Sequence, residues 1–206
     1  MKINLAVLVS GRGSNLEAIA KAIKNKQLTS EIKIVIINNK HAMAVEVCKI
    51  YNLPYAIIEN KNLSRLEHEK MVINEIKKHN CQLIVLAGYM RVLTKNFLEE
   101  FKNKTGEFYH VVNIHPSLIP AFTGRNAYEQ AFNYGVKISG ITVHLVNEEI
   151  DGGAILAQEC FRISPNDSLD DVKAKGLKIE HELYPQTLQN IITNGIQIGT
   201  YTFLIS

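Results

Sequence analysis

The sequence lacks any hydrophobic run long enough to cross a membrane. Its longest apolar stretch, at residues 83–90, is far shorter than the roughly 20 residues that a spanning helix needs. It also lacks a strong charge of either sign, because 23 lysines and arginines against 20 acidic residues leave a formal net charge of +3. We therefore expect neither a membrane nor a nucleic acid as a partner.

Signatures of disulfide frameworks, metal sites and several enzyme classes are missing as well. The three cysteines are widely separated without a CxxC pattern, which predicts reduced thiols in a cytoplasmic protein. The other histidines besides His115 have no paired spacing with cysteine or acidic residues, so no metal site is expected. Neither GxSxG nor the lysine of a P-loop is present.

No repeat, low-complexity tract or linker rich in Pro, Gly or Ser divides the chain. With 46% hydrophobic and 21% charged residues, the composition is that of a globular protein. We expect residues 1–206 to form one domain. The apolar run after Lys2 ends in a glycine-rich turn rather than a cleavage site, so we interpret it as a first strand and not as a secretion signal.

Apolar runs and amphipathic segments alternate along the first half of the chain. The pattern predicts strands at residues 3–9, 32–37, 55–58 and 83–87, and helices at 16–24, 43–51 and 64–79. Ser64 and Glu67 have the spacing of a capping box at the start of the third helix. This order predicts an α/β fold with a doubly wound, mostly parallel sheet and helices on both faces.

The second half is less regular. It predicts strands at residues 109–114, 140–146 and 154–163, and helices at 126–134 and 169–194, the last capped by Asp167 or Ser168. The strands at 140–146 and 154–163 are close in sequence, so they are expected to pair antiparallel. We expect one mixed sheet with an antiparallel C-terminal portion.

A glycine-rich turn, GRGSN at residues 11–15, follows the first strand. Its glycines allow close backbone approach, and the N-terminus of the next helix favours a phosphate. The alternative is structural, since Ser14 and Glu17 also have capping-box spacing. A dinucleotide fits poorly, because Leu16 takes the place of the third fingerprint glycine and Asn38-Asn39 that of the acidic residue. The turn therefore predicts one phosphate or none.

Two further features carry groups suited to catalysis. Asn113 and His115 share one face at the C-terminal end of a strand, where an amide can stabilise an oxyanion and an imidazole can transfer a proton. Asp151, before two glycines, could orient that imidazole or simply form a hairpin turn. Asn113 and His115 could equally satisfy backbone groups, and sequence spacing leaves these alternatives open. His144, in an alternating strand, is interpreted as a hydrogen-bonded sheet histidine.

Taken in order, four motifs resemble the phosphoribosylglycinamide formyltransferase family. They are GRGSNL at 11–16, LAGYMRVL at 86–93, NIHPSLIP at 113–120 and DGG at 151–153. The resemblance extends from about residue 3 to residue 185. It implies a Rossmann-like formyltransferase fold and transfer of a formyl group from 10-formyltetrahydrofolate to the amine of 5-phosphoribosylglycinamide, without a metal. A cytoplasmic monomer or homodimer is expected.

The resemblance also implies a role for each matched position. Asn113, His115 and Asp151 would be catalytic, and the ribonucleotide would be bound by Gly13, Ser14, Asn15 and Glu180. The folate would be bound by Asn113, Asp151 and a further set: Arg65, Met90, Arg91, Val92, Leu93, Asn147, Glu148, Glu149 and Ile150. Two positions depart from the family's pattern, because Thr123 and Ala154 stand where proline is usual.

Two related enzymes and a binding module are alternative interpretations of these motifs. Formyltetrahydrofolate deformylase usually has an extra N-terminal domain, and methionyl-tRNA formyltransferase a further C-terminal one. The length of this chain favours neither. A non-catalytic folate- or nucleotide-binding module would keep Ser14 as a cap and His115 as a structural residue.

Overall fold

The computed structural model describes residues 2–204. The first elements are β1 (Ile3–Val9), α1 (Ser14–Lys24), β2 (Ser30–Ile37), α2 (Ala44–Ile50), β3 (Tyr55–Ile57), α3 (Arg65–Lys78), β4 (Leu83–Leu86), α4 (Lys95–Glu99) and β5 (Val111–His115). They are followed by α5 (Ala127–Tyr134), β6 (Ile138–Leu145), β7 (Ile155–Arg162), α6 (Leu169–Asn194), β8 (Ile196–Ile198) and β9 (Tyr201–Phe203).

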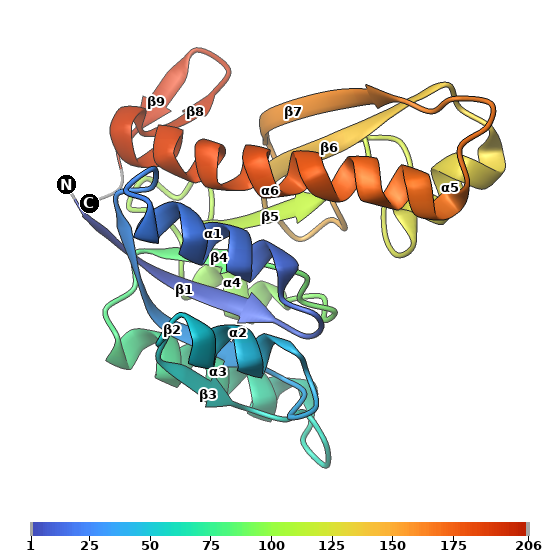
Figure 1. Cartoon of the computed structure of the whole chain (residues 1–206). Coiled ribbons are helices and arrows are strands. Elements are labelled where there is room, and N and C mark those ends of the chain that lie inside the picture. Colours follow the sequence, from blue (N-terminus) through green and yellow to red (C-terminus); the bar gives the residue numbers. More distant parts are fainter. Residues whose placement is uncertain (1, 205–206) are drawn as a thin grey trace.

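A seven-stranded sheet in the order β3-β2-β1-β4-β5-β6-β7 organises these elements (Figure 1). The strands from β3 to β5 are parallel, whereas β6 pairs antiparallel with β5 and β7 antiparallel with β6. The chain winds outward from β1 to β3 and then returns to β4 on the other side of β1. The predicted doubly wound, mostly parallel sheet with an antiparallel C-terminal portion is confirmed.

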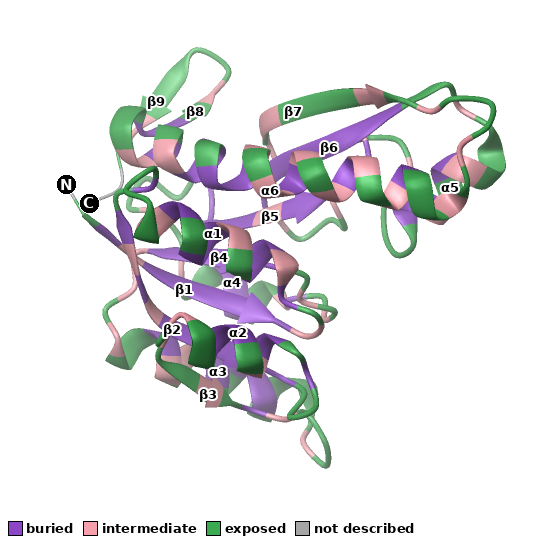
Figure 2. Ribbon diagram, in the orientation of Figure 1, coloured by how far each residue is buried: buried purple, intermediate pink, exposed green. Residues whose placement is uncertain are grey.

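Helices cover both faces of the sheet. One apolar cluster joins the sheet to α1, α2 and α6, and a second joins the opposite face to α3 and α4. Strands β1 and β4 lie between the two clusters and are almost fully buried, while the edge strands β3 and β7 are largely exposed (Figure 2). Burial on both faces explains why the central strands read as unbroken apolar runs rather than alternating ones.

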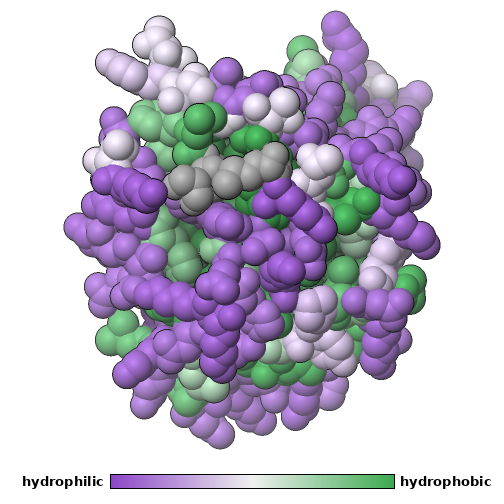
Figure 3. Space-filling view, turned by 90° about the vertical axis from the view of Figure 1, so that its left-hand side faces the viewer, coloured by the Kyte–Doolittle hydropathy of each residue, from purple (hydrophilic) through white to green (hydrophobic). Residues whose placement is uncertain are grey.

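Hydrophilic side chains cover most of the face seen in Figure 3, with hydrophobic ones in separate groups among them. Among residues 2–204, no helix combines the length and the apolar character that a membrane span requires.

The start of α1 differs from the prediction. Gly13 precedes the helix with φ 81° and no side-chain cap is formed, so Ser14 is the first helical residue and the capping-box interpretation of Ser14 and Glu17 is wrong. A Cβ on Gly13 would lie 3.0 Å from the Cα of Ala44, where α2 begins. Because α2 packs this closely against residue 13, only glycine fits there in its left-handed conformation. The helix then begins at the next residue, Ser14. Its hydroxyl does not cap α1.

Short elements escaped prediction. Helix α4 has five residues, and β8 and β9 have three each, forming a separate antiparallel hairpin. Such segments contain too few residues for a hydrophobic period to emerge. The predicted capping box at Ser64 is present, and of the two candidate caps for the last helix the structure selects Ser168, which forms a capping box with Asp171.

One side chain of α6 holds the centre of the sheet. Tyr184 is fully buried, and its hydroxyl lies 3.0 Å from the backbone oxygens of Leu86 in β4 and Val112 in β5. Burial raises the pKa of Tyr184 well above its usual range, so the phenol remains a donor. The contact fixes α6 across the two strands whose ends carry the candidate site.

Replacement of Tyr184 by Phe tests this anchor. The variant keeps the packed ring but leaves the two carbonyls without their donor, which should lower the free energy of unfolding by about 1–3 kcal/mol. Urea denaturation measures the loss. Tyr201→Phe, which removes an exposed hydroxyl, is the control and should leave stability unchanged. Equal stabilities of the Tyr184→Phe variant and the wild type would show that the contact is not an anchor.

Candidate active site

The loops that follow β1, β4 and β5 meet at one edge of the sheet. The strand order reverses between β1 and β4, and open α/β sheets bind ligands outside the carboxyl ends of the strands at such a point. Two hydrogen bonds join the first two loops: Ser10 N donates to Gly88 O at 3.1 Å, and Met90 N donates to Ser10 Oγ at 2.8 Å.

At this edge the structure brings two predicted catalytic residues together. His115 ends β5, and Asp151 lies in the loop between β6 and β7 with φ 52°. The distance from His115 Nδ1 to Asp151 Oδ2 is 3.3 Å, and the two side chains are only 5% and 11% exposed. Little water therefore lies around the carboxylate and the imidazole to screen one from the other. The hairpin-only alternative for Asp151 is thus not the arrangement observed.

The segment after β5 holds both members of this pair through its backbone. His115 Nε2 lies 2.9 Å from Phe122 O, and Gly124 N donates to Asp151 Oδ2 at 2.7 Å. A carbonyl oxygen can only accept, so Nε2 carries a hydrogen, while Nδ1 faces a carboxylate. Both ring nitrogens therefore face acceptors, an arrangement that accommodates the doubly protonated imidazolium. Nothing in the sequence indicated these two backbone contacts.

Asn113, the third predicted catalytic residue, is held by a residue that the sequence did not assign to the site. Its Nδ2 lies 3.1 Å from Nε2 of His144, the residue opposite it in the β5–β6 register. His144 Nδ1 donates to Leu145 O at 2.8 Å, which leaves Nε2 as the acceptor in the neutral ring. Burial lowers the pKa of His144 and so favours that neutral form.

The interpretation of His144 as a hydrogen-bonded sheet histidine is confirmed, and its contact with Asn113 places it in the cluster. Its Nε2 is also 3.7 Å from Asp151 Oδ1. These contacts follow from the register in which β6 pairs with β5. That register cannot be read from one sequence, so the contacts could not be predicted.

The predicted ribonucleotide residues lie between α1 and α6. Asn15 Nδ2 donates to Glu180 Oε2 at 2.6 Å, joining residues from the two ends of the chain. Tyr128, which the sequence did not single out, donates to Glu180 Oε1, also at 2.6 Å. Within residues 2–204, Asn15 Oδ1 is buried and has no hydrogen-bond partner. Ser14 lies in the wall of a cavity of about 770 Å³ between the two helices.

The predicted folate residues occupy the loops beside the catalytic cluster and the start of α3. Met90, Val92 and Ile150 are 61%, 49% and 59% exposed, which is unusual for three large apolar side chains on neighbouring loops. Arg65 is exposed at the first position of α3, and Leu93 is buried. Two hydrogen bonds brace the loop between β6 and β7. Tyr109, which precedes β5, donates to Glu148 at 2.7 Å, and within the loop Glu149 N donates to Asn147 Oδ1 at 3.0 Å.

A buried carboxylate on α3 supports one of these loops. Glu69 accepts hydrogen bonds from both the backbone N and the hydroxyl of Thr94, the residue that caps α4. Thr94 directly follows the segment 90–93, so Glu69 fixes the end of that segment. Sequence reasoning missed Glu69, because an acidic residue in an amphipathic helix is ordinarily on its solvated face.

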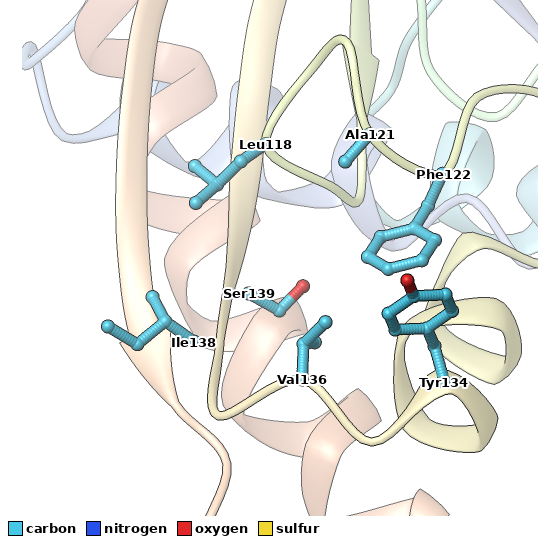
Figure 4. A pocket seen from close by; sticks show the side chains of 7 residues that line it. All are labelled: Leu118, Ala121, Phe122, Tyr134, Val136, Ile138 and Ser139. Carbon is cyan, nitrogen blue, oxygen red and sulfur yellow. The ribbon is translucent and has the colours of Figure 1, made fainter.

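A second cavity is lined by none of the predicted residues. About 410 Å³ in volume, it is lined by Leu118, Ala121, Phe122, Tyr134, Val136, Ile138 and Ser139 (Figure 4). None of these residues was predicted to bind or catalyse. Within the described part of the chain, no group of three His, Cys, Asp or Glu side chains is arranged to hold a metal ion.

Comparisons with known proteins show the family of the chain. Residues 3–188 match the formyl transferase family. The chain is 35% identical to phosphoribosylglycinamide formyltransferase of Bacillus subtilis, over 91% of this chain and 93% of that protein. It is 38% identical to the Haemophilus influenzae protein of the same name, over 90% and 85%. The crystal structure of phosphoribosylglycinamide formyltransferase from Bacillus halodurans superimposes with a TM-score of 0.87 at 37% identity, over 92% and 95%.

The doubly wound sheet carries an amide, an imidazole and a carboxylate clustered beside β5, as in an α/β enzyme, and the chain belongs to the formyl transferase family. Within that family it is one of the phosphoribosylglycinamide formyltransferases, the transferases that act in purine biosynthesis. The resemblance drawn from the four motifs is confirmed.

The buried state of His144 predicts a pH dependence of stability. Its pKa is lowered in the folded protein, chiefly by burial, so the unfolded chain binds a proton more readily. The free energy of unfolding should therefore fall as the pH drops below the ordinary histidine value of 6.5. Replacing His144 with Gln should make this dependence shallower.

Urea denaturation at a series of pH values measures both slopes. His68 and His110 are shifted in the same direction by burial, so only the difference between wild type and variant reports on His144. His41→Gln, at an exposed histidine, is the control and should keep the wild-type slope. An unchanged slope in the His144→Gln variant would contradict a neutral, buried His144.

Proposed function

We propose that this chain transfers the formyl group of 10-formyltetrahydrofolate to the amine of 5-phosphoribosylglycinamide through the cluster of Asn113, His115 and Asp151. The observation that carries the proposal is the buried His115–Asp151 pair, with Asn113 two residues away on the same strand. These groups supply an oxyanion donor, a proton donor and a carboxylate at one place.

The reaction needs two substrates side by side, and the surroundings of the cluster offer a place for each. The exposed apolar side chains of Met90, Val92 and Ile150 suit a flat pterin ring. On the other side, the N-terminus of α1 at Ser14 offers backbone N–H groups and a partial positive charge to a phosphate.

In the proposed mechanism, the amine attacks the formyl carbon directly. A carbon–nitrogen bond forms, and the formyl oxygen becomes the oxyanion of a tetrahedral intermediate. One hydrogen of Asn113 Nδ2 is held by His144, which leaves the second for that oxygen. His115, doubly protonated beside Asp151, adds a positive charge and a donor.

Collapse of the intermediate breaks the bond from the carbonyl carbon to N10 of the folate. The proton that the amine loses is relayed by Asp151, through water, to the departing folate nitrogen. Holding both substrates in line removes much of the entropic barrier. We also propose that the protein acts in the cytoplasm. It would do so as a single domain, in the form of a monomer or a homodimer.

Replacement of Asn113 by Ala tests the oxyanion role. Loss of one donor to the developing charge should lower kcat about 10²–10³-fold, or about 2.7–4 kcal/mol of barrier, while thermal unfolding stays close to wild type. Asn133→Ala, at an exposed position of α5, is the control and should keep full activity. A folded Asn113→Ala protein with near-wild-type kcat would remove Asn113 from the mechanism.

A coupled assay tests the reaction itself. Consumption of 10-formyltetrahydrofolate should require 5-phosphoribosylglycinamide and should yield the formylated ribonucleotide in equal amount. Release of formate at the same rate without the acceptor would instead identify a deformylase. Binding of either compound without turnover would identify a binding module.

A further inference from the structure

Glu180 is a buried carboxylate without a partner of opposite charge. It is 6% exposed, and none of the ion pairs among residues 2–204 includes it. Two neutral donors bind it instead, Asn15 at Oε2 and Tyr128 at Oε1. Acidic side chains are rarely buried in this way unless their oxygens are hydrogen-bonded, so these two donors decide where the carboxylate lies.

Tyr128, the donor on α5, stays protonated. Tyr128 is 9% exposed, and burial followed by the nearby Glu180 charge raises the pKa of its phenol. The phenol therefore keeps its hydrogen and always donates it to the carboxylate, at 2.6 Å. A hydrogen bond between a hydroxyl and a charged acceptor at this distance is among the stronger ones in proteins.

Helix α6 leaves space for this phenol. Gly176 stands one turn before Glu180, inside the helix and on the same side. A Cβ at Gly176 would lie 2.2 Å from the Tyr128 hydroxyl oxygen, so any other residue would displace the ring. Glycine in a helix interior is unfavourable compared with alanine. Its presence here is explained by the space that Tyr128 occupies.

We propose that Tyr128 is a positioning residue that holds the Glu180 carboxylate for the ribonucleotide substrate. The inference rests on the proposed function and extends it to Glu180, which the family resemblance assigns to the ribonucleotide. Each carboxylate oxygen has two lone-pair sites; Tyr128 uses one on Oε1 and Asn15 one on Oε2, which leaves one on each oxygen for donors of the substrate. Because Asn15 follows Ser14 at the start of α1, the carboxylate also keeps a fixed place relative to the phosphate site.

In this role Tyr128 affects binding of the ribonucleotide and not binding of the folate. Tyr128 forms no hydrogen bond with Asn113, His115 or Asp151 among the contacts of the described residues. Loss of its hydroxyl should therefore weaken binding of the ribonucleotide while chemistry and folate binding persist. A purely structural role would instead lower stability or affect both substrates alike.

Steady-state kinetics on the Tyr128→Phe variant, with each substrate varied in turn, test the proposal. The ring and its packing remain and only the donor is lost. We expect the KM for 5-phosphoribosylglycinamide to rise about tenfold, the loss of one hydrogen bond to a charged group. The KM for 10-formyltetrahydrofolate and kcat should change less than about twofold, because neither depends on this donor. Tyr134→Phe, which removes an exposed hydroxyl from the same helix, should match wild type.

A second variant, Gly176→Ala, disturbs the contact between Tyr128 and Glu180 from the side of α6. Its methyl group should displace the phenol and raise the same KM selectively, with no loss of helix content by circular dichroism. An unchanged ribonucleotide KM in both variants would overturn the proposal, and so would an equal rise in both KM values.

Calorimetric titration with 5-phosphoribosylglycinamide separates this inference from the proposed function. If the wild type binds the compound but transfers no formyl group, the proposed function fails, and the Kd of the Tyr128→Phe variant still tests Tyr128. A tenfold weaker Kd supports the positioning role. An equal Kd, or no binding to the wild type, contradicts it.

Discussion

The structure depends on one buried contact, the approach of the Asp151 carboxylate to the His115 imidazole. A charged group this poorly exposed is costly unless every acceptor has a donor, and the protein supplies donors from the backbone as well as from side chains. Gly124 N donates to Asp151, and Phe122 O accepts a hydrogen bond from His115 Nε2. The segment between β5 and α5 therefore acts as the structural support of the pair, and its backbone geometry matters as much as its side chains.

Another buried carboxylate, Glu180, is likewise held by hydrogen bonds from distant parts of the chain. Glu180 connects Asn15 at the start of α1 with Tyr128 near the start of α5, so one side chain of α6 ties together three helices. Tyr184, one turn further along the same helix, contacts the backbone of β4 and β5. Within two turns, helix α6 thus carries Glu180, which belongs to the candidate substrate site, and Tyr184, which contacts β4 and β5.

The sequence predicted the repeating elements well, because burial on both faces produces unbroken apolar runs in β1 and β4, and because capping residues marked the starts of α3 and α6. It also indicated Asn113, His115 and Asp151 as chemically suited groups. It could not show that they meet, since Asp151 reaches His115 only through the antiparallel register of β6 and β7. For the same reason the contact of His144 with Asn113 was not predicted, and Tyr128 and Glu69 were missed, because each contacts a partner distant in sequence. The alternative in which Ser14 caps α1 is wrong because packing of α2 on Gly13, which is a tertiary contact, decides where α1 begins.

The central claim is that His115 and Asp151 act as one unit in formyl transfer. A double-mutant cycle on kcat, with His115→Ala, Asp151→Asn and the two combined, measures this coupling most directly. Residues that act together lose activity non-additively, so the double variant should be no slower than about the worse of the two single variants. Losses that multiply would show that the two residues act independently and would contradict the account.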